Sequence, residues 1–109
     1  MIAYEDFLKV EMRVGTILEV SEFPRAHKPA YRLRIDFGPF GVKQTSAQIT
    51  AFYGKEELVG RQVVAVINFP PKNIAGFRSE VLVLGPVLED GRVVLLSPER
   101  QTANGTLVL

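Results

Sequence analysis

Apolar and polar residues alternate along several stretches of this chain, and this pattern restricts it to folds built from strands with one buried face. The alternation is clearest in YRLRIDF, residues 31–37, and it recurs from Val10 to Val20. Successive side chains of a strand point to opposite faces, so a period of two places every second residue in the core. We predict two long strands here, with Gly15 permitting a bend or bulge in the first.

Further strands are predicted at residues 43–49, 63–68, 81–85, 92–98 and 106–109. The run VVAVIN, residues 63–68, is apolar almost throughout, as expected of a strand that is covered on both sides. The turn signal Glu89-Asp90-Gly91 joins the two strands that precede the last one.

A short helix is predicted between residues 50 and 60. Thr50 can cap its N-terminus, Leu58 can form its buried face, and Gly60 can end it. A helix after the third strand is the element order of an all-β, five-stranded Greek-key barrel, although other small barrels and sandwiches share the strand spacing. With 109 residues, the chain fits a single domain, residues 1–109.

The scarcity of chemically reactive side chains narrows the function. The chain has no cysteine, which excludes a disulfide framework, a thiolate metal site and a cysteine nucleophile. Its one histidine, His27, lies in the turn FPRAHKP, where we predict a structural or surface role. The sequence contains no phosphate-binding glycine loop and no convergent set of metal ligands. We therefore predict a binding protein without enzymatic activity, metal or cofactor.

The N-terminal segment, MIAYEDFLKVEMRV, does not have the basic stretch and long apolar run of a signal sequence. No apolar run approaches the roughly 18 residues that span a bilayer. We expect a soluble, cytoplasmic protein that does not insert into a membrane.

Positive charge is concentrated in one part of the chain. The formal net charge is only +1, so no strong overall field attracts nucleic acid. Between residues 25 and 43, however, five cationic side chains accompany a single acid. This basic band is either a solvated strand face or an anion-binding surface.

The segment NFPPKNIAGFRSEVLVLG, residues 68–85, is the most informative about function. It sets two prolines, several apolar residues and two cations between apolar strands, in what we predict to be a loop. Phe69 and Phe77 either fold back over the end of the barrel or form an exposed apolar surface, and contiguous exposed apolar area marks a partner site. Such a surface suits an extended polypeptide or an unpaired stretch of RNA.

Several motifs resemble a known family. EMRVGTI, IDFG, YGKEELVGRQVVAVIN and NFPPKNIAGFRSE follow one another as in the tRNA-binding domain appended to some methionyl- and phenylalanyl-tRNA synthetases. KQTSAQIT and VVLLSPERQTANGT are similar to the CsaA family of export-related chaperones within that group. This resemblance implies an oligonucleotide/oligosaccharide-binding (OB) fold with N- and C-terminal extensions. It also implies a homodimer that binds unfolded precursor proteins and cooperates with the SecA translocase.

The chain departs from the tRNA-binding members at three places. Residues 23–27 replace a His-Pro-x-Ala-Asp turn, residues 46–48 replace Ser-Gly-Leu, and residues 68–71 replace Asn-Leu-Lys-Pro. The last change removes a cation and adds apolar area, which shifts the balance from phosphate toward peptide contact. Arg78-Ser79 matches the family motif, so RNA also remains a candidate partner.

Two binding hypotheses follow, and a third is a structural dimer module that tethers other proteins. In the first, an apolar groove flanked by cations binds unfolded polypeptides, while Asn68 braces the loop. The predicted peptide-binding residues are Gln44, Ser46, Gln48, Phe69, Pro71, Ile74 and Phe77. In the second, the same face binds tRNA. The predicted RNA- or anion-binding residues are Arg32, Arg34, Lys43, Lys72, Arg78 and Ser79.

Overall fold

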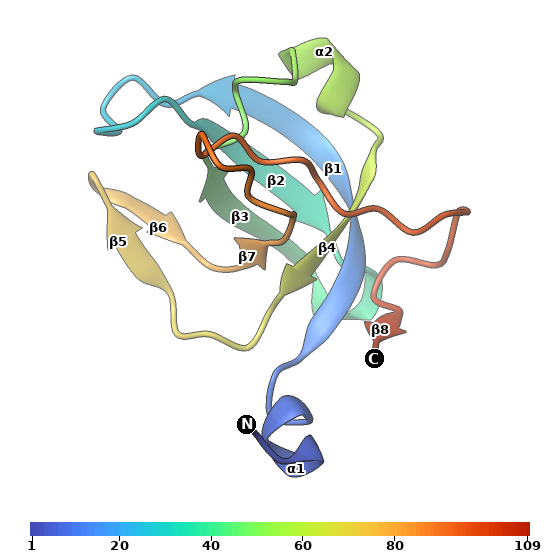
Figure 1. The fold of residues 1–109 in the computed structure, drawn as a ribbon. Coiled ribbons are helices and arrows are strands. Elements are labelled where there is room, and N and C mark those ends of the chain that lie inside the picture. Colours follow the sequence, from blue (N-terminus) through green and yellow to red (C-terminus); the bar gives the residue numbers. More distant parts are fainter.

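A five-stranded antiparallel sheet curls into a nearly closed barrel in the computed structural model, which describes residues 1–109 (Figure 1). The sheet order is β3-β2-β1-β4-β7, and β8 adds to β1. The strands are β1 (Met12–Glu22), β2 (Tyr31–Asp36), β3 (Val42–Ala47), β4 (Gln62–Val66), β5 (Lys72–Ile74), β6 (Phe77–Ser79), β7 (Leu82–Val83) and β8 (Leu107–Val108). The helices are α1 (Tyr4–Phe7), the 3-10 turn η1 (Gly38–Phe40) and α2 (Lys55–Leu58). The predicted all-β barrel with a helix after the third strand is confirmed.

The core lies inside the barrel and follows the predicted alternation. In β2, Tyr31, Leu33 and Ile35 are buried, whereas the residues between them are not. All five residues of β4 are buried, which confirms that this strand is covered on both sides. Burial of every second residue is what stabilises these strands, because side-chain packing on the core face dominates strand stability.

The long strand β1 pairs with β4 along one edge, and with β8 and then β2 along the other. Its bulge lies between Ile17 and Glu19, where the register with β2 shifts, and not at Gly15 as we predicted. Gly15 instead allows close packing. A Cβ atom built there would lie 2.6 Å from Ile35 Cγ2 and 2.7 Å from Phe37 Cε1.

We expect the substitution Gly15→Ala to lower the free energy of unfolding by about 1–3 kcal/mol, because the added methyl group overpacks the core. Urea denaturation followed by circular dichroism measures this change. Gly54→Ala is the matched control, because its Cβ would meet only flexible carboxylate ends at 3.2 and 3.3 Å. An equal loss in both variants would contradict the packing role of Gly15.

The helix α2 is a single turn and is shorter than predicted. Gly54, with extended backbone angles, is its N-cap, and the Gly54 N–H donates to the Glu57 carboxylate at 2.7 Å. Thr50 therefore does not cap the helix, because the residues between it and Gly54 form a turn. Leu58 is fully buried, as predicted, and anchors α2 to the core.

The segment predicted as a loop contains a β-hairpin, which we call the hairpin arm (residues 72–79). β5 pairs with β6, opposing Lys72 to Ser79 and Ile74 to Phe77. Ala75 and Gly76 form the turn, with φ angles of 50° and 83°. Positive φ at both central positions is the geometry that two-residue hairpins favour.

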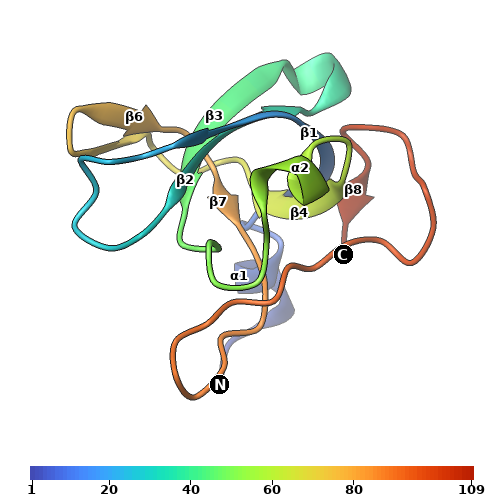
Figure 2. The same cartoon turned by 90° about the horizontal axis from the view of Figure 1, so that it is seen from above.

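The predicted strand at residues 92–98 is absent. The segment 84–96 instead leaves the barrel and returns, with one isolated bridge between Val87 and Val93 (Figure 2). Pro86 lacks an N–H, and at Gly85 the chain crosses so close to Val94 O that a Cβ would lie 2.0 Å from it. A regular ladder cannot extend through these two positions.

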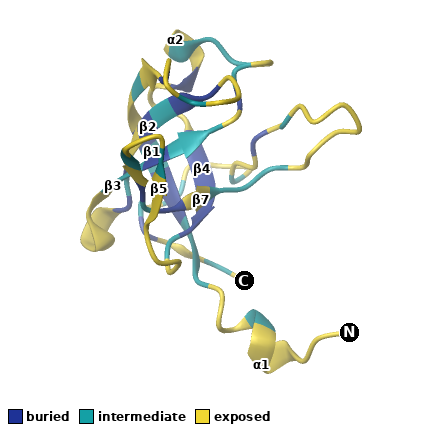
Figure 3. Cartoon of the chain, turned by 90° about the vertical axis from the view of Figure 1, so that its left-hand side faces the viewer, coloured by how far each residue is buried: buried dark blue, intermediate teal, exposed yellow.

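Both termini extend beyond the barrel, as predicted. α1 has no buried residue and projects from it (Figures 1 and 3). β8 is bonded to the start of β1 through Met12 and Arg13. None of the helices combines the length and apolar character that crossing a membrane requires.

Candidate binding groove

A cavity of about 570 Å³, which we call the groove, lies between the hairpin arm, the end of β3, β7 and the segment 84–96. Its volume is in the range of ligand-binding sites. The residues that line it are Ser46, Ala47, Gln48, Ile49, Phe69, Pro70, Lys72, Ile74, Ser79, Glu80, Val81, Leu82, Val83, Gly85, Val87 and Val93. Most of these side chains are apolar, so the groove can take apolar groups out of water.

The structure brings four of the seven predicted peptide-binding residues into the groove. These are Ser46, Gln48, Phe69 and Ile74. Phe69 stays 51% exposed and so forms part of an accessible wall. Pro71 is also exposed but lies outside the lining, where Pro70 takes its place.

Phe77 lies outside the groove, in a contact with Phe23. The two ring centroids are 5.4 Å apart and the ring planes meet at 61°, a favourable edge-to-face arrangement. Phe23 is buried, so the contact fixes the tip of the hairpin arm to the end of β1. Of the two phenylalanines, one is thus exposed and the other packs inward.

Gln44 also lies outside the groove, and its amide is used within the protein. Its side chain donates to Arg78 O at 2.9 Å, and its backbone N–H donates to the Glu80 carboxylate at 2.9 Å. Gln44 therefore joins β3 to the hairpin arm and to the strand that follows it.

Ser79 is buried at the base of the hairpin arm. Its hydroxyl oxygen accepts the Ser46 N–H at 3.2 Å and lies 2.9 Å from the Thr45 hydroxyl. The Thr45 hydroxyl donates its proton to Val81 O at 2.7 Å, so Ser79 is the donor to Thr45. Such a satisfied buried network holds the arm at a fixed position over the groove.

The predicted cations occupy different parts of the surface. Arg32 and Arg34 alternate with the buried residues of β2, and Arg34 forms an ion pair with Glu19 at 3.4 Å. The Arg32 guanidinium lies 5.6 Å from the Phe23 ring centroid, and its Nε is buried without a hydrogen-bond partner. Lys72 lines the groove, whereas Lys43, Arg78 and the two β2 arginines do not.

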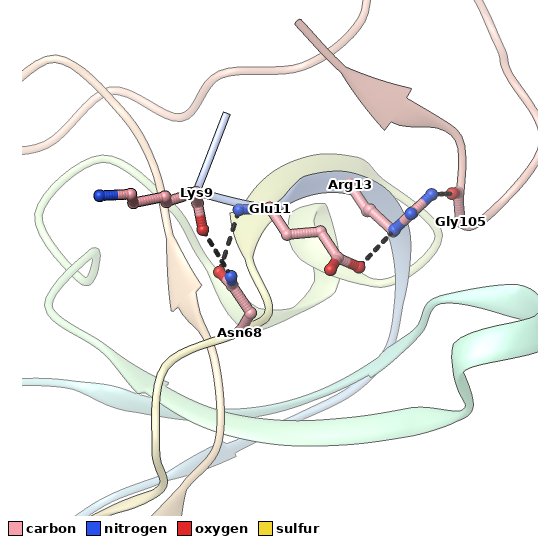
Figure 4. A network of polar contacts seen from close by, with 5 residues as sticks. All are labelled: Lys9, Glu11, Arg13, Asn68 and Gly105. Atoms are coloured by element: carbon pink, nitrogen blue, oxygen red, sulfur yellow. Dashed lines mark hydrogen bonds and ion pairs between the residues drawn. The ribbon is translucent and has the colours of Figure 1, made fainter. Parts of the chain in front are cut away.

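Asn68 holds the N-terminal segment against the chain that leads into the groove (Figure 4). Its side-chain oxygen accepts the Glu11 N–H at 3.0 Å, and its amide donates to Lys9 O at 2.7 Å. Asn68 thus bonds to backbone far away in sequence, rather than to its own loop as we expected.

A second group, Glu11 and Arg13, extends this network and is not apparent from the sequence. Arg13 Nε donates to the Glu11 carboxylate at 2.8 Å, and Arg13 Nη1 donates to Gly105 O at 2.8 Å (Figure 4). The guanidinium also stacks on Phe40, 4.0 Å from the ring centroid. The sequence shows opposite charges at Glu11 and Arg13, two residues apart, which could have indicated that the two side chains pair. Their other partners, Asn68 and Gly105, lie far along the chain and could not be inferred.

The polar lining of the groove consists of hydroxyl and amide groups and of the charged Lys72 and Glu80. No three His, Cys, Asp or Glu side chains lie together in a way that could hold a metal ion. Outside the groove, the Arg92 N–H donates to the Asp90 carboxylate at 3.1 Å and lowers the pKa of Asp90. The site therefore offers apolar contact, hydrogen bonding, one cation, Lys72, and one carboxylate, Glu80.

An antiparallel five-stranded barrel with a helix after the third strand and a groove beside its sheet defines a small binding module of the OB fold. The chain belongs to the family described as "Putative tRNA binding domain", whose sequence model matches residues 12–107. Methionine–tRNA ligase of Porphyromonas gingivalis is 41% identical over 107 residues, which cover 98% of this chain and 15% of the ligase. The chain thus spans about 15% of the length of this and similar curated relatives.

Two solved structures match the whole chain. The chaperone CsaA of Bacillus anthracis str. Ames superimposes with a TM-score of 0.96 at 56% identity, covering 100% of this chain and 99% of that one. The CsaA chaperone of Picrophilus torridus superimposes with a TM-score of 0.94 at 53% identity, with 100% of both chains covered. These neighbours are chaperones, and the ligases contain the tRNA-binding domain as an appended part.

Proposed function

We propose that this protein is a cytoplasmic chaperone that binds unfolded polypeptides in the groove, and that it is not an enzyme. The observation that carries the proposal is the groove itself, with the exposed Phe69 ring in an apolar wall beside the polar Ser46 and Gln48. The similarity to chaperones over the full chain supports it.

The groove suits a weak and broadly selective interaction. Apolar side chains of the polypeptide would gain about 25 cal/mol for each Å² that they remove from water. Much of that gain offsets the ordering of a disordered segment, which keeps the affinity modest. Modest affinity suits a chaperone, because the bound chain has to be released.

We expect Phe69→Ala to weaken the binding of a labelled unfolded-protein peptide about tenfold, because the variant removes apolar contact area from the groove wall. Fluorescence anisotropy titration at moderate salt measures the affinity. Phe52→Ala is the control, since Phe52 is a partly exposed phenylalanine outside the groove. Unchanged binding by the Phe69 variant would mean that the peptide site lies elsewhere.

The resemblance to CsaA extends the proposal to protein export. In this reading the bound polypeptides are precursors of exported proteins, and the SecA translocase receives them. Sedimentation of purified SecA with this protein, in the presence and absence of a precursor, tests the point. Association of SecA with this protein that requires the precursor would support the export role. The absence of any association would exclude that role.

A second candidate function is tRNA binding. Membership in the tRNA-binding-domain family favours it, and so do several cations that form no ion pair. Lys43, Lys72 and Arg78 form no salt bridge, so their charges are available to phosphate groups. Arg32 and Arg34 of β2 alternate with its core residues and so lie on the other face of that strand.

If tRNA binds, its affinity should fall steeply with salt, because each phosphate contact to a single-stranded region adds about 0.7 to the slope of log affinity against log salt. The double variant Lys43→Ala, Arg78→Ala should reduce that slope by about 1.4. Filter-binding titrations over a salt series measure it, with Arg100→Ala, a cation paired to Glu99, as the control. Retention that is absent or insensitive to salt would exclude this function.

A further inference from the structure

The barrel is closed between its two edge strands, β3 and β7, by contacts that do not form a regular ladder. The Thr45 hydroxyl donates to Val81 O at 2.7 Å, and Glu80 exchanges hydrogen bonds with Gln44. The sheet order places β3 and β7 at opposite ends, with no strand pairing between them. Past these contacts, both edges border the groove.

The backbone of Val83 presents an unpaired edge to the groove. Antiparallel strands alternate between hydrogen-bonded and non-hydrogen-bonded residue pairs. The Leu84 N–H donates to Val64 O at 2.9 Å, which makes these two residues a hydrogen-bonded pair. The neighbouring pair of Val83 with Ala65 is then non-hydrogen-bonded, so the N–H and C=O of Val83 point away from β4.

On the opposite wall, the unpaired backbone belongs to Gln48. The Ser46 N–H is bonded to Ser79 Oγ, so the backbone of this residue faces away from β2. Gln48 follows two residues later, just past the end of β3, and its backbone N–H and C=O take part in no hydrogen bond within the chain. Both Ser46 and Gln48 line the groove.

We propose that a polypeptide binds in the groove as an added β-strand, with its backbone hydrogen-bonded to Val83 and to the chain at Gln48. This inference rests on the proposed polypeptide-binding function and specifies how that function operates. Backbone bonding supplies affinity that does not depend on sequence, while alternate side chains enter the apolar floor. The occupant is therefore an extended segment with apolar residues at every second position.

The charge of the rim adds a preference. Lys72 lines the groove and forms no ion pair, and Glu80, the other charged residue of the lining, is engaged by the Gln44 N–H. The groove thus carries one cation that is free of any ion pair, beside a carboxylate that is held by a backbone N–H. An acidic residue among the outward-facing positions of the bound strand complements Lys72.

Backbone N-methylation of the peptide tests the strand geometry, because it removes the N–H donor and keeps the side chain. The probe is a nine-residue peptide in which apolar and polar residues alternate and one polar position is Glu. One set of derivatives is methylated at the odd positions and another at the even positions. Successive N–H groups of the bound strand point to opposite walls, toward Val83 or toward the chain at Gln48, so each set loses the bonds to one wall, and we expect both sets to bind about three- to tenfold more weakly than the parent.

Unchanged binding by either set would overturn a strand bonded to both walls while leaving polypeptide binding in place. No binding of the parent peptide would overturn the proposed function and this inference with it. The protein gives an independent readout. Hydrogen exchange of the Val83 amide should slow at least tenfold in the complex, whereas the Leu84 amide, bonded to Val64 O in the free protein, should change little.

A charge exchange tests the preference of the rim. Lys72→Glu should weaken binding of the Glu-containing peptide about fivefold, and replacing that Glu by Lys in the peptide should restore it. The same weakening with both peptides would show that Lys72 acts without charge complementarity. Hydrogen exchange of the Val83 amide, measured in the same complexes, reports on the strand geometry separately from the charge preference.

Discussion

An Ile74→Asp variant should bind unfolded polypeptides about 100-fold more weakly than the natural protein. Ile74 lies on β5 with its side chain in the groove, so the substitution removes apolar surface and adds a charge that a bound apolar chain would have to desolvate. Losing the burial of an Ile side chain amounts to about 1.5–3 kcal/mol, and the desolvated carboxylate adds to this. Anisotropy titration with the peptide used for Phe69→Ala measures the change.

The neighbouring residue provides a control with the same charge. Asn73→Asp places a carboxylate one position earlier in β5, on the opposite face of the strand. Asn73 Oδ1 accepts the Gly76 N–H at 2.9 Å, and an aspartate keeps that acceptor, so the turn of the hairpin arm is preserved. We expect binding within about twofold of the natural protein. Equal losses in both variants would point to a general effect of negative charge, and no loss in either would exclude the groove.

The barrel could be predicted from the sequence because its strands obey a local rule. Alternation fixes which residues of β2 face the core, and an uninterrupted apolar run identifies β4. The same rule failed for residues 92–98, which are apolar but follow Pro86 and the close crossing at Gly85. There the geometry of the backbone, and not the side-chain pattern, decides whether a strand forms.

The groove could be predicted only in part, because its walls come from segments that are distant in the sequence. Phe69 and Phe77 are the same residue type in one segment, and nothing local tells which is exposed. The hairpin register and the position of Phe23 decide it, since Phe23 provides the ring on which Phe77 packs. Val87 and Val93 join the lining only because the segment 84–96 turns back beside β7.

Exposed apolar residues gather on one side of the barrel. α1 and the segment 84–96 both project from the barrel toward the right of Figure 3; α1 has no buried residue, and most residues of the segment 84–96 are exposed. The exposed large apolar residues of these segments include Met1, Ile2, Tyr4, Leu8, Val87, Leu88, Val94 and Leu96. Exposed apolar surface of this extent is typical of a protein interface. It favours the homodimer that the resemblance implies, in which a two-fold axis would bring the same surface of two copies together.

The dimer would also explain how a four-residue helix persists at the end of the chain. α1 is too short to be stable alone, and no residue in it is buried within its own subunit. Its main attachment is a pair of hydrogen bonds just after the helix, in which the Asn68 amide donates to Lys9 O and accepts from the Glu11 N–H. Packing against a second copy would supply the burial that the subunit itself does not provide.

The double variant Tyr4→Glu, Leu8→Glu should therefore convert a dimer into a monomer, with an increase of about 1000-fold or more in the dimer dissociation constant. Tyr4 and Leu8 are four residues apart and so share one side of α1, where they are 66% and 51% exposed. Each copy would place two carboxylates in the interface, so the loss of about 4 kcal/mol is a lower bound for a two-fold contact. Sedimentation velocity over a concentration series measures the dissociation constant.

The control variant Ser21→Glu, His27→Glu adds the same charge at exposed positions on β1 and the loop that follows it, and it should remain dimeric. A natural protein that sediments as a monomer at every concentration would refute the homodimer. If both variants dissociate, net charge rather than the α1 surface controls assembly. Val87, on the segment 84–96, lines the groove and is also one of the exposed apolar residues assigned to the interface, so the monomeric variant should also bind peptide more weakly. Unaltered peptide affinity in the monomer would show that each groove works independently of the partner subunit.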